Sequence, residues 1–247
     1  MAFRPGPRNV PRNNPAVVGR LIRPGQVSGG ISAPPTPNLA AWWDLSQLNG
    51  VADGASLAGL TDLSTAGRNA VLSSGSTMPT FARSVSAFGG LHGLSTSGLQ
   101  RFDLAGPSLV LGACAVFCVL DRPTLGDNLW ALCGGTTNGL LLLSDGNVFS
   151  PFHHFAYSLA GPQLARWFRD SISDPWVFRG TGMSADVAFS ASEASFTADG
   201  LLHRNQVGGD VGGNGIFGEW RIFDHPLSSG DRTNEENYLS AKWGVSA

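Results

Sequence analysis

The sequence predicts an all-β protein that carries an extended N-terminal arm. Of its 247 residues, 33 are Gly and 15 are Pro, and only 14% are charged, against about 25% in an average globular chain. Short apolar segments alternate with Gly, Asn, Asp and Ser along most of the sequence, as expected for strands joined by tight turns. The length is enough for one large sandwich or two smaller domains.

The predicted arm spans residues 1–37 and the predicted sandwich spans residues 38–247. The arm holds eight of the fifteen prolines and five arginines, with no Asp, Glu or Lys, so its charge is +5. The rest of the chain carries 11 basic and 18 acidic side chains, a net charge of −7. Dense prolines remove the backbone donors that helices and sheets need, so the arm should be extended.

The arm is the predicted attachment segment. Its apolar pairs are suited to adding a strand to a neighbouring subunit or to filling a groove, and its charge suits an acidic protein lattice. Nucleic acid is not expected as the partner, because five arginines with no lysine make a thin phosphate-binding patch. The predicted contact residues are Arg4, Arg8, Arg12, Val17, Val18, Arg20, Leu21, Ile22 and Arg23.

The pattern of residues 38–247 predicts a series of short strands. The predicted apolar segments are residues 39–45, 69–72, 102–104, 108–120, 128–133, 140–143, 176–179, 187–189, 194–197 and 218–223. Asp145-Gly146 and Asp199-Gly200 are dipeptides that favour two-residue hairpin turns. The sequence therefore predicts a sandwich or barrel with at least two hairpins.

One short helix is predicted at the C-terminus. Ser228 is suited to the N-cap and Asp231 follows it three residues later, while Lys242 and Gly244 favour the C-terminal end. Trp220 and Phe223 in the preceding strand, with Tyr238 and Trp243 in the helix, are predicted to pack inward.

The three cysteines predict no disulfide framework. Cys114 and Cys118 lie four residues apart in one strand-like run, too far apart to bond. Cys133 could reach one of them across strands, but we expect three buried thiols in a reducing compartment. The first residues lack the apolar region of a signal peptide, and no apolar run reaches 18 residues, so we expect assembly in a cytoplasm without membrane insertion.

Two groups of residues resemble a known family. The first runs from Trp42-Trp43-Asp44-Leu45 through 60–64 and 67–70 to Pro79-Thr80-Phe81. The second comprises residues 218–228 and the helix that ends at Lys242-Trp243-Gly244. Both are similar to the concanavalin A-like, laminin-G-like jelly-roll domains that occur in tailed-phage virion proteins. The resemblance covers about residues 39–247 and implies a jelly-roll β-sandwich, but fold does not decide function.

The sequence lacks the usual catalytic patterns of such sandwiches. Related glycosidases carry carboxylates at alternate positions of one strand, whereas the glutamates here are only Glu193, Glu219, Glu235 and Glu236. No Gly-x-Ser-x-Gly motif is present. The Gly-x-Gly-x-x-Gly match at 213–218 precedes a strand rather than a helix, so it predicts a loop. The sequence therefore predicts a protein that is not an enzyme.

Ligand signals are sparse. No His or Cys spacing matches a zinc site, and His153-His154 between two phenylalanines are expected to pack. We expect no cofactor, with calcium as the open alternative, and its candidate ligands are Asp44, Asp62, Asp199, Asp210 and Asp224. Most of the seven tryptophans are expected in the core, and Trp167 and Trp176, which are flanked by charged residues, are the candidates for a surface position that stacks on a sugar.

Together these observations predict a virion structural protein on the surface of a tailed phage. The arm would join capsid proteins or a tail or fibre base, and the body would contact a host-surface glycan. We expect a homo-oligomer, with a trimer as one option. The alternative is a free-standing, lectin-like domain that binds or acts on carbohydrate.

Overall fold

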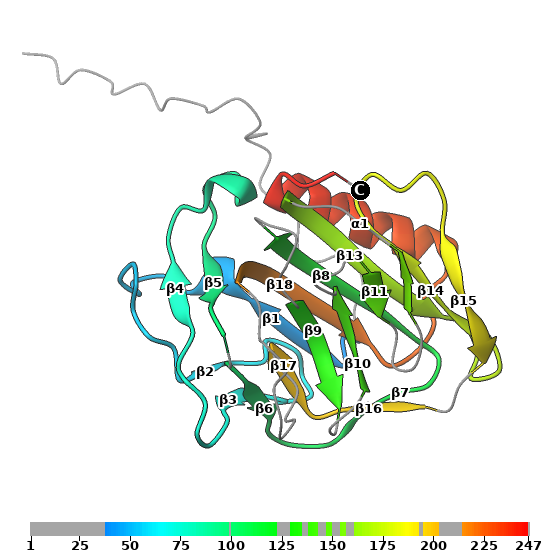
Figure 1. The fold of residues 1–247 in the computed structure, drawn as a ribbon, viewed down its shortest axis with the longest axis horizontal. Coiled ribbons are helices and arrows are strands. Elements are labelled where there is room, and N and C mark those ends of the chain that lie inside the picture. Colours follow the sequence, from blue (N-terminus) through cyan, green and yellow to red (C-terminus); the bar gives the residue numbers. More distant parts are fainter. Residues whose placement is uncertain are drawn as a thin grey trace, which may run out of the picture. The chain divides into compact units, whose positions relative to one another are not determined.

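The computed structural model describes residues 38–98, 100–122, 129–134, 138–142, 147–149, 154–156, 161–192, 195–202 and 214–246. It confirms an all-β jelly-roll sandwich with one short C-terminal helix (Figure 1). The predicted arm and all nine of its contact residues lie outside the described residues.

Sheet A is an antiparallel sheet in the order β15-β14-β13-β8-β18-β5-β4, and β1 also pairs with β18. Its strands are β1 (Ala41–Asp44), β4 (Thr80–Ala82), β5 (Gly93–Thr96), β8 (Cys114–Arg122), β13 (Gly161–Arg169), β14 (Pro175–Arg179), β15 (Val187–Ser192) and β18 (Gly215–Phe223).

Sheet B is also antiparallel, in the order β12-β11-β10-β9-β17-β6-β3-β2. Its strands are β2 (Gly59–Leu60), β3 (Ala70–Leu72), β6 (Phe102–Leu104), β9 (Leu129–Gly134), β10 (Asn138–Leu142), β11 (Asn147–Phe149), β12 (His154–Ala156) and β17 (Gly200–Leu202). A separate two-stranded ribbon pairs β7 (Leu109–Leu111) with β16 (Phe196–Ala198).

Two short 3-10 helices and one α-helix complete the fold. The 3-10 helices are η1 (Leu45–Gln47) and η2 (Ser86–Phe88), and the α-helix is α1 (Ser229–Trp243). Ser228 Oγ accepts the Asp231 N–H at 3.1 Å, and Gly244 closes the helix at φ +67° with its N–H on the Ser240 carbonyl. These contacts confirm the predicted caps. None of the described helices is long and apolar enough to cross a membrane.

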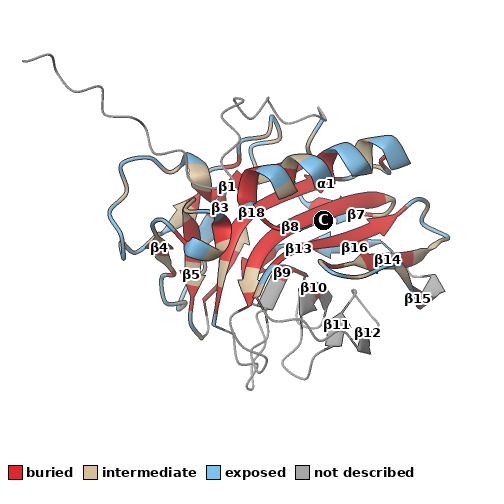
Figure 2. Cartoon of the chain, turned by 90° about the horizontal axis from the view of Figure 1, so that it is seen from above, coloured by how far each residue is buried: buried red, intermediate tan, exposed pale blue. Residues whose placement is uncertain are grey.

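Sheet A is covered on both faces, which explains the long apolar run at 108–120. Val116, Cys118 and Leu120 of β8 point into the core shared with sheet B, whereas Phe117 and Val119 pack with Leu239 and Trp243 of the helix. A strand that is buried on both faces needs apolar residues at every position rather than at alternate ones. Figure 2 shows α1 lying across the sheet, with buried strands beneath it.

Trp220 joins the two sheets at the centre of the sandwich. Its side chain is fully buried and stacks on Phe217 with ring centroids 5.0 Å apart. Its Nε1 donates to the Ala131 carbonyl of β9 at 3.0 Å. Phe223 and Trp243 are also fully buried, whereas Tyr238 is half-buried against the same cluster. The inward packing predicted for the closing strand and helix is therefore confirmed, with Tyr238 at its edge.

The two hairpin predictions have different outcomes. Strands β10 and β11 pair in register, with Leu142 opposite Val148, and the turn residues 143–146 lie outside the described residues. The hairpin at Asp199-Gly200 is wrong: β16 belongs to the ribbon and β17 to sheet B. The Asp199 backbone instead bonds to Cys133 and Leu104, so it cannot close a two-residue turn.

We predict that Trp220→Ala lowers the free energy of unfolding by about 3 to 5 kcal/mol, because it removes a large buried ring and leaves a cavity. Urea unfolding followed by circular dichroism measures this loss. Val110→Ala is the control, since Val110 is 48% exposed and its truncation should change stability by about 0.5 kcal/mol or less. Similar losses for both variants would contradict the central role of Trp220.

Candidate functional site

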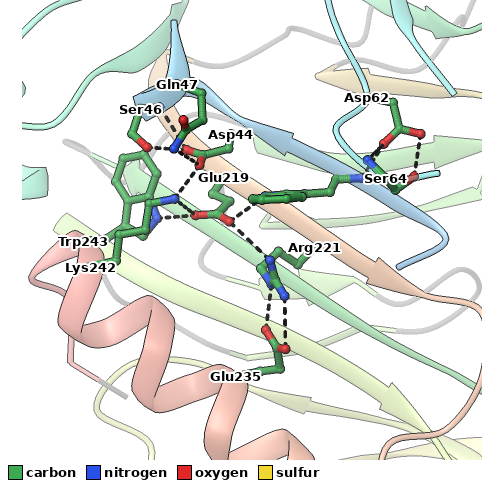
Figure 3. Close-up of polar contacts among 11 residues, drawn as sticks. Asp44, Ser46, Gln47, Asp62, Ser64, Glu219, Arg221, Glu235, Lys242 and Trp243 are labelled. Atoms are coloured by element: carbon green, nitrogen blue, oxygen red, sulfur yellow. Dashed lines mark hydrogen bonds and ion pairs between the residues drawn. The ribbon is translucent and has the colours of Figure 1, made fainter. Parts of the chain in front are cut away.

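A buried polar cluster lies between α1 and sheet A (Figure 3). Glu219 Oε2 accepts hydrogen bonds from Lys242 Nζ and Trp243 Nε1, both at 2.6 Å, and its Oε1 accepts one from Trp42 Nε1 at 2.8 Å. Lys242 Nζ also donates to Asp44 Oδ2 at 2.6 Å. The side chains of Asp44 and Glu219 are fully buried, so these carboxylates are satisfied inside the protein.

Arg221 extends the same cluster along β18. Its guanidinium donates to both Glu235 oxygens, at 2.6 and 3.1 Å, and both side chains are fully buried. The guanidinium carbon lies 5.2 Å from the Trp42 ring centroid and 5.3 Å from that of Tyr238. An ion pair stacked between aromatic rings in this way is shielded from water, which strengthens it.

Burial and charge oppose each other at Glu219 and Lys242. Burial raises the pKa of Glu219, and Lys242 acts in the opposite direction. Burial alone would lower the pKa of Lys242, but Glu219 and Asp44 outweigh it, so that pKa is raised. Every donor around Glu219 points at its carboxylate, which favours the ionised form. The cluster therefore anchors the helix and offers no carboxyl group to a substrate.

Asp62 has a comparable structural role in the loop after β2. Its carboxylate accepts the backbone N–H groups of Trp42, Ser64 and Arg68 at 2.7–2.9 Å, and the Ser64 hydroxyl at 2.8 Å. This explains the Asp-Leu-Ser and Gly-Arg-Asn segments that the sequence analysis singled out. The loop is built around one carboxylate that gathers donors.

The other calcium candidates are dispersed. Asp224 lies 3.5 Å from His225, Asp199 pairs with an arginine, and Asp210 lies outside the described residues. No three His, Cys, Asp or Glu side chains come together as a metal site within the part of the chain that the structure describes. The three cysteines are buried, as predicted, and none of them forms a disulfide.

The prediction that Trp167 and Trp176 lie on the surface is wrong. Both are fully buried in the core between the sheets. They lie on β13 and β14, and Trp167 packs on Phe178 with centroids 5.1 Å apart. The charged residues around them mark the turn at 170–174, but the alternation of each strand directs the indoles inward. They cannot serve as a sugar platform.

An accessible acidic pair lies on the outer face of sheet B. Arg101 Nε donates to Asp103 Oδ1 at 2.6 Å and its Nη2 donates to Asp199 Oδ1 at 2.7 Å. The two carboxylate side chains are 50% and 48% exposed, whereas the Arg101 side chain is only 7% exposed. One buried guanidinium thus holds two carboxylates at the surface.

A glycine in the neighbouring strand leaves room for the Arg101 side chain. Gly200 of β17 faces Asp103 of β6 in register, and a Cβ on Gly200 would approach the Arg101 Cζ to 2.7 Å. On the other side, Arg101 Nη1 lies 3.1 Å from Cys133 Sγ. Burial lowers the pKa of Arg101, but Cys133 and the two carboxylates more than offset it. The cation that fixes the pair therefore stays charged.

Arg101 and Asp103 were not among the site residues predicted from the sequence. The signal was the spacing Arg-Phe-Asp around a buried Phe102, because residues two apart in a strand point to the same face. The sequence points to Asp199 only as a calcium ligand and as part of a hairpin turn. Its position beside Asp103 depends on the pairing of β17 with β6, which no local pattern reveals.

Comparisons with known proteins relate the chain to others through fold alone. No family model and no curated protein sequence matches it. A GH54 α-L-arabinofuranosidase soaked with a cyclic sulfate inhibitor has a TM-score of 0.53 at 14% identity, over 78% of this chain and 52% of that chain. Trypanosoma rangeli sialidase in complex with sialic acid has a TM-score of 0.51 at 10% identity, over 85% and 34%. This chain thus spans about half of the arabinofuranosidase and a third of the sialidase.

These similarities correct the prediction that the protein is not an enzyme. That prediction rested on the missing strand pattern of one glycosidase type. The present fold is shared with structures of an arabinofuranosidase and a sialidase, so the missing pattern does not argue against catalysis. The similarity itself establishes only the fold.

We predict that the stability conferred by Lys242 is lost at alkaline pH. Its pKa in the folded protein lies above the ordinary 10.5, so the folded state keeps this proton after the unfolded state has released it. The free energy of unfolding should therefore fall as pH rises from about 10.5 to the folded pKa. Urea titrations at successive pH values measure the fall.

The pKa of Tyr238 is also raised by burial, and this acts in the same direction. The measurement is therefore made in a Tyr238→Phe background. Adding Lys242→Met should lower stability at neutral pH and flatten the alkaline decline. An equally steep decline without Lys242 would show that another group causes it.

Proposed function

We propose that this sandwich is a carbohydrate-recognition domain that binds a glycan at Asp103 and Asp199. The observation that carries the proposal is the acidic pair held by buried Arg101 on an exposed sheet face. Carboxylates accept hydrogen bonds from sugar hydroxyls, and recognition sites rely on a few polar groups fixed by their neighbours. The fold shared with carbohydrate-active structures supports the same conclusion.

The geometry suits binding without large rearrangement. Arg101 is fixed by Asp103, Asp199 and Cys133, so its two carboxylates are positioned before any ligand arrives. Preorganised groups lose less entropy on binding than mobile ones. Gly200 has no side chain to fill the surface beside the two carboxylates, which leaves space for a sugar ring.

We predict that Asp103→Asn and Asp199→Asn each weaken glycan binding by about tenfold, the value of one charge-assisted hydrogen bond. A glycan array identifies the ligand, and calorimetry with that glycan measures the affinity of each variant. Asp170→Asn is the matched control, because Asp170 is also an exposed carboxylate paired with an arginine, Arg232.

The outcomes separate binding from hydrolysis. The same glycans are assayed for release of new reducing ends, which would extend the proposal from recognition to catalysis. If no glycan binds, or if all three variants bind as the wild type does, the proposed function fails.

We further propose that the arm attaches this domain to a larger assembly, with a tailed-phage virion as the candidate. Its support is the separation of charge in the sequence, +5 in residues 1–37 and −7 in the rest. In this proposal the partners are capsid or tail-base proteins or further copies of the chain, and the sandwich is displayed on the particle surface.

We predict that deletion of residues 1–37 leaves a folded domain that no longer joins its assembly. Calorimetry should still show cooperative unfolding, and co-sedimentation with particles should be lost. Neutral replacements at Arg4, Arg8 and Arg12 should weaken attachment in a salt-dependent way, because exposed charges are screened over about 10 Å at 0.1 M salt. Loss of cooperative unfolding would instead place the arm in the core.

A further inference from the structure

Two arginines face each other on the outer side of sheet A, beside the helix. Arg166 of β13 and Arg179 of β14 are register partners. Like charges directly opposite each other in a sheet are destabilising unless something offsets them. Arg166 is nevertheless fully buried, and its strand β13 lies between β8 and β14 in sheet A (Figure 1).

The described residues around this arginine pair do not satisfy all of its hydrogen-bond donors. Arg166 Nη1 lies 2.9 Å from Glu236 Oε2 of α1, and Arg166 Nε donates to the Arg179 carbonyl at 3.2 Å. Arg179 Nη1 lies 3.6 Å from the half-exposed Asp186. Arg166 Nη2 and Arg179 Nε are buried and have no hydrogen-bond partner among the residues that the structure describes.

Both donors are on the same face of sheet A, because Arg166 and Arg179 are register partners in adjacent strands. Arg166 Nε donates to the backbone carbonyl of Arg179, so the Arg166 guanidinium reaches β14, and the charge of Arg179 is near enough to lower the pKa of Arg166. A buried donor without a partner costs about 1 to 3 kcal/mol, and more when it is charged. Two such donors from neighbouring guanidinium groups form the arrangement that binds oxyanions.

We propose that Arg166 and Arg179 form a binding site for a small oxyanion, a carboxylate or phosphate group, between α1 and β14. The site opens on the Arg179 side, where the Arg179 side chain is 35% exposed and Asp186 is 49% exposed. The longer contact with Asp186 makes Arg179 the side chain that moves to admit the anion. Arg166, closed off beneath Glu236, supplies the fixed charge. This site is separate from the acidic pair on sheet B and does not depend on glycan binding there.

The charges nearby are consistent with an added anion. Burial lowers the pKa of Arg166, Glu236 opposes this, and Arg179 adds to the lowering. An oxyanion between the two arginines would oppose both unfavourable effects. It would also screen the repulsion between the strands, so binding should stabilise the folded protein.

The test measures the thermal stability of the full chain by calorimetry at pH 7 and constant ionic strength. The probes are inorganic phosphate and glucuronate, with chloride and neutral glucose as controls. A ligand that binds only the folded state raises Tm in proportion to its occupancy. We expect phosphate, glucuronate or both to raise Tm with concentration, while chloride and glucose have no such effect.

Variants locate the site. Arg179→Gln should weaken the apparent affinity by about tenfold or more, and Arg179→Lys should also weaken it, because a lysine keeps the charge but lacks the Nε donor. Asp186→Asn should strengthen binding, since it removes the carboxylate that competes for Arg179. Arg83→Gln removes a positive charge at an exposed position elsewhere and should change nothing.

The outcomes decide both the site and the source of its anion. A response to glucuronate alone identifies an acidic sugar as the ligand class, whereas a response to phosphate, alone or with glucuronate, identifies a general oxyanion site. The proposal is overturned if no probe stabilises the wild type beyond chloride, or if Arg179→Gln responds as the wild type does. Asp103→Asn should leave this response unchanged, so failure here is distinguishable from failure of glycan binding.

Discussion

The C-terminal end of α1 is attached to β1 and β18 through one buried carboxylate. Glu219 accepts an ammonium and two indole donors, so the C-terminal end of the helix and the first strand of the sandwich meet at a single group. Removing one partner of such a buried pair leaves the other charge without compensation, which is costly. The apolar contacts of Leu239 and Trp243 supply the remaining attraction, but the ionic contacts fix the position of the helix. Gly218 adds to this fit, because a Cβ there would meet the Trp243 ring at 2.8 Å.

The parts of the fold that the sequence predicts well are those with local signals. The caps of α1 depend on Ser228 and Gly244 alone. The apolar run of β8 predicts a strand, because a strand buried on both faces is apolar at every position. Asp199-Gly200 misleads because a turn-forming dipeptide specifies backbone conformation, not the pairing of the strands beside it. Here the two strands belong to different sheets, because the Asp199 backbone forms hydrogen bonds with the distant residues Leu104 and Cys133.

The candidate sites were harder to predict for the same reason. Arg101 and Asp103 are two residues apart, so their shared face could be read from the sequence, but Asp199 joins them from 98 positions away. Trp167 and Trp176 show the reverse error: charged neighbours in the chain suggested exposure, whereas the pleat directs both rings into the core. The charged neighbours in the sequence belong to the turn between the two strands, whereas the alternation along each strand determines which side chains are buried.

The ion pairs on the two outer faces of the sandwich differ in which partner is buried. On the helix side, Asp44, Glu219 and Glu235 are enclosed with Lys242 and Arg221, and their hydrogen bonds are made within the protein. On the outer face of sheet B, Arg101 is the buried partner and the carboxylates are the exposed ones. The same ion-pair chemistry therefore has opposite consequences: where the carboxylate is buried it holds the fold together, and where only the cation is buried it presents acceptors to solvent. Of these two arrangements, only the second offers its carboxylates to a ligand that needs hydrogen-bond acceptors, which is why we propose recognition on sheet B.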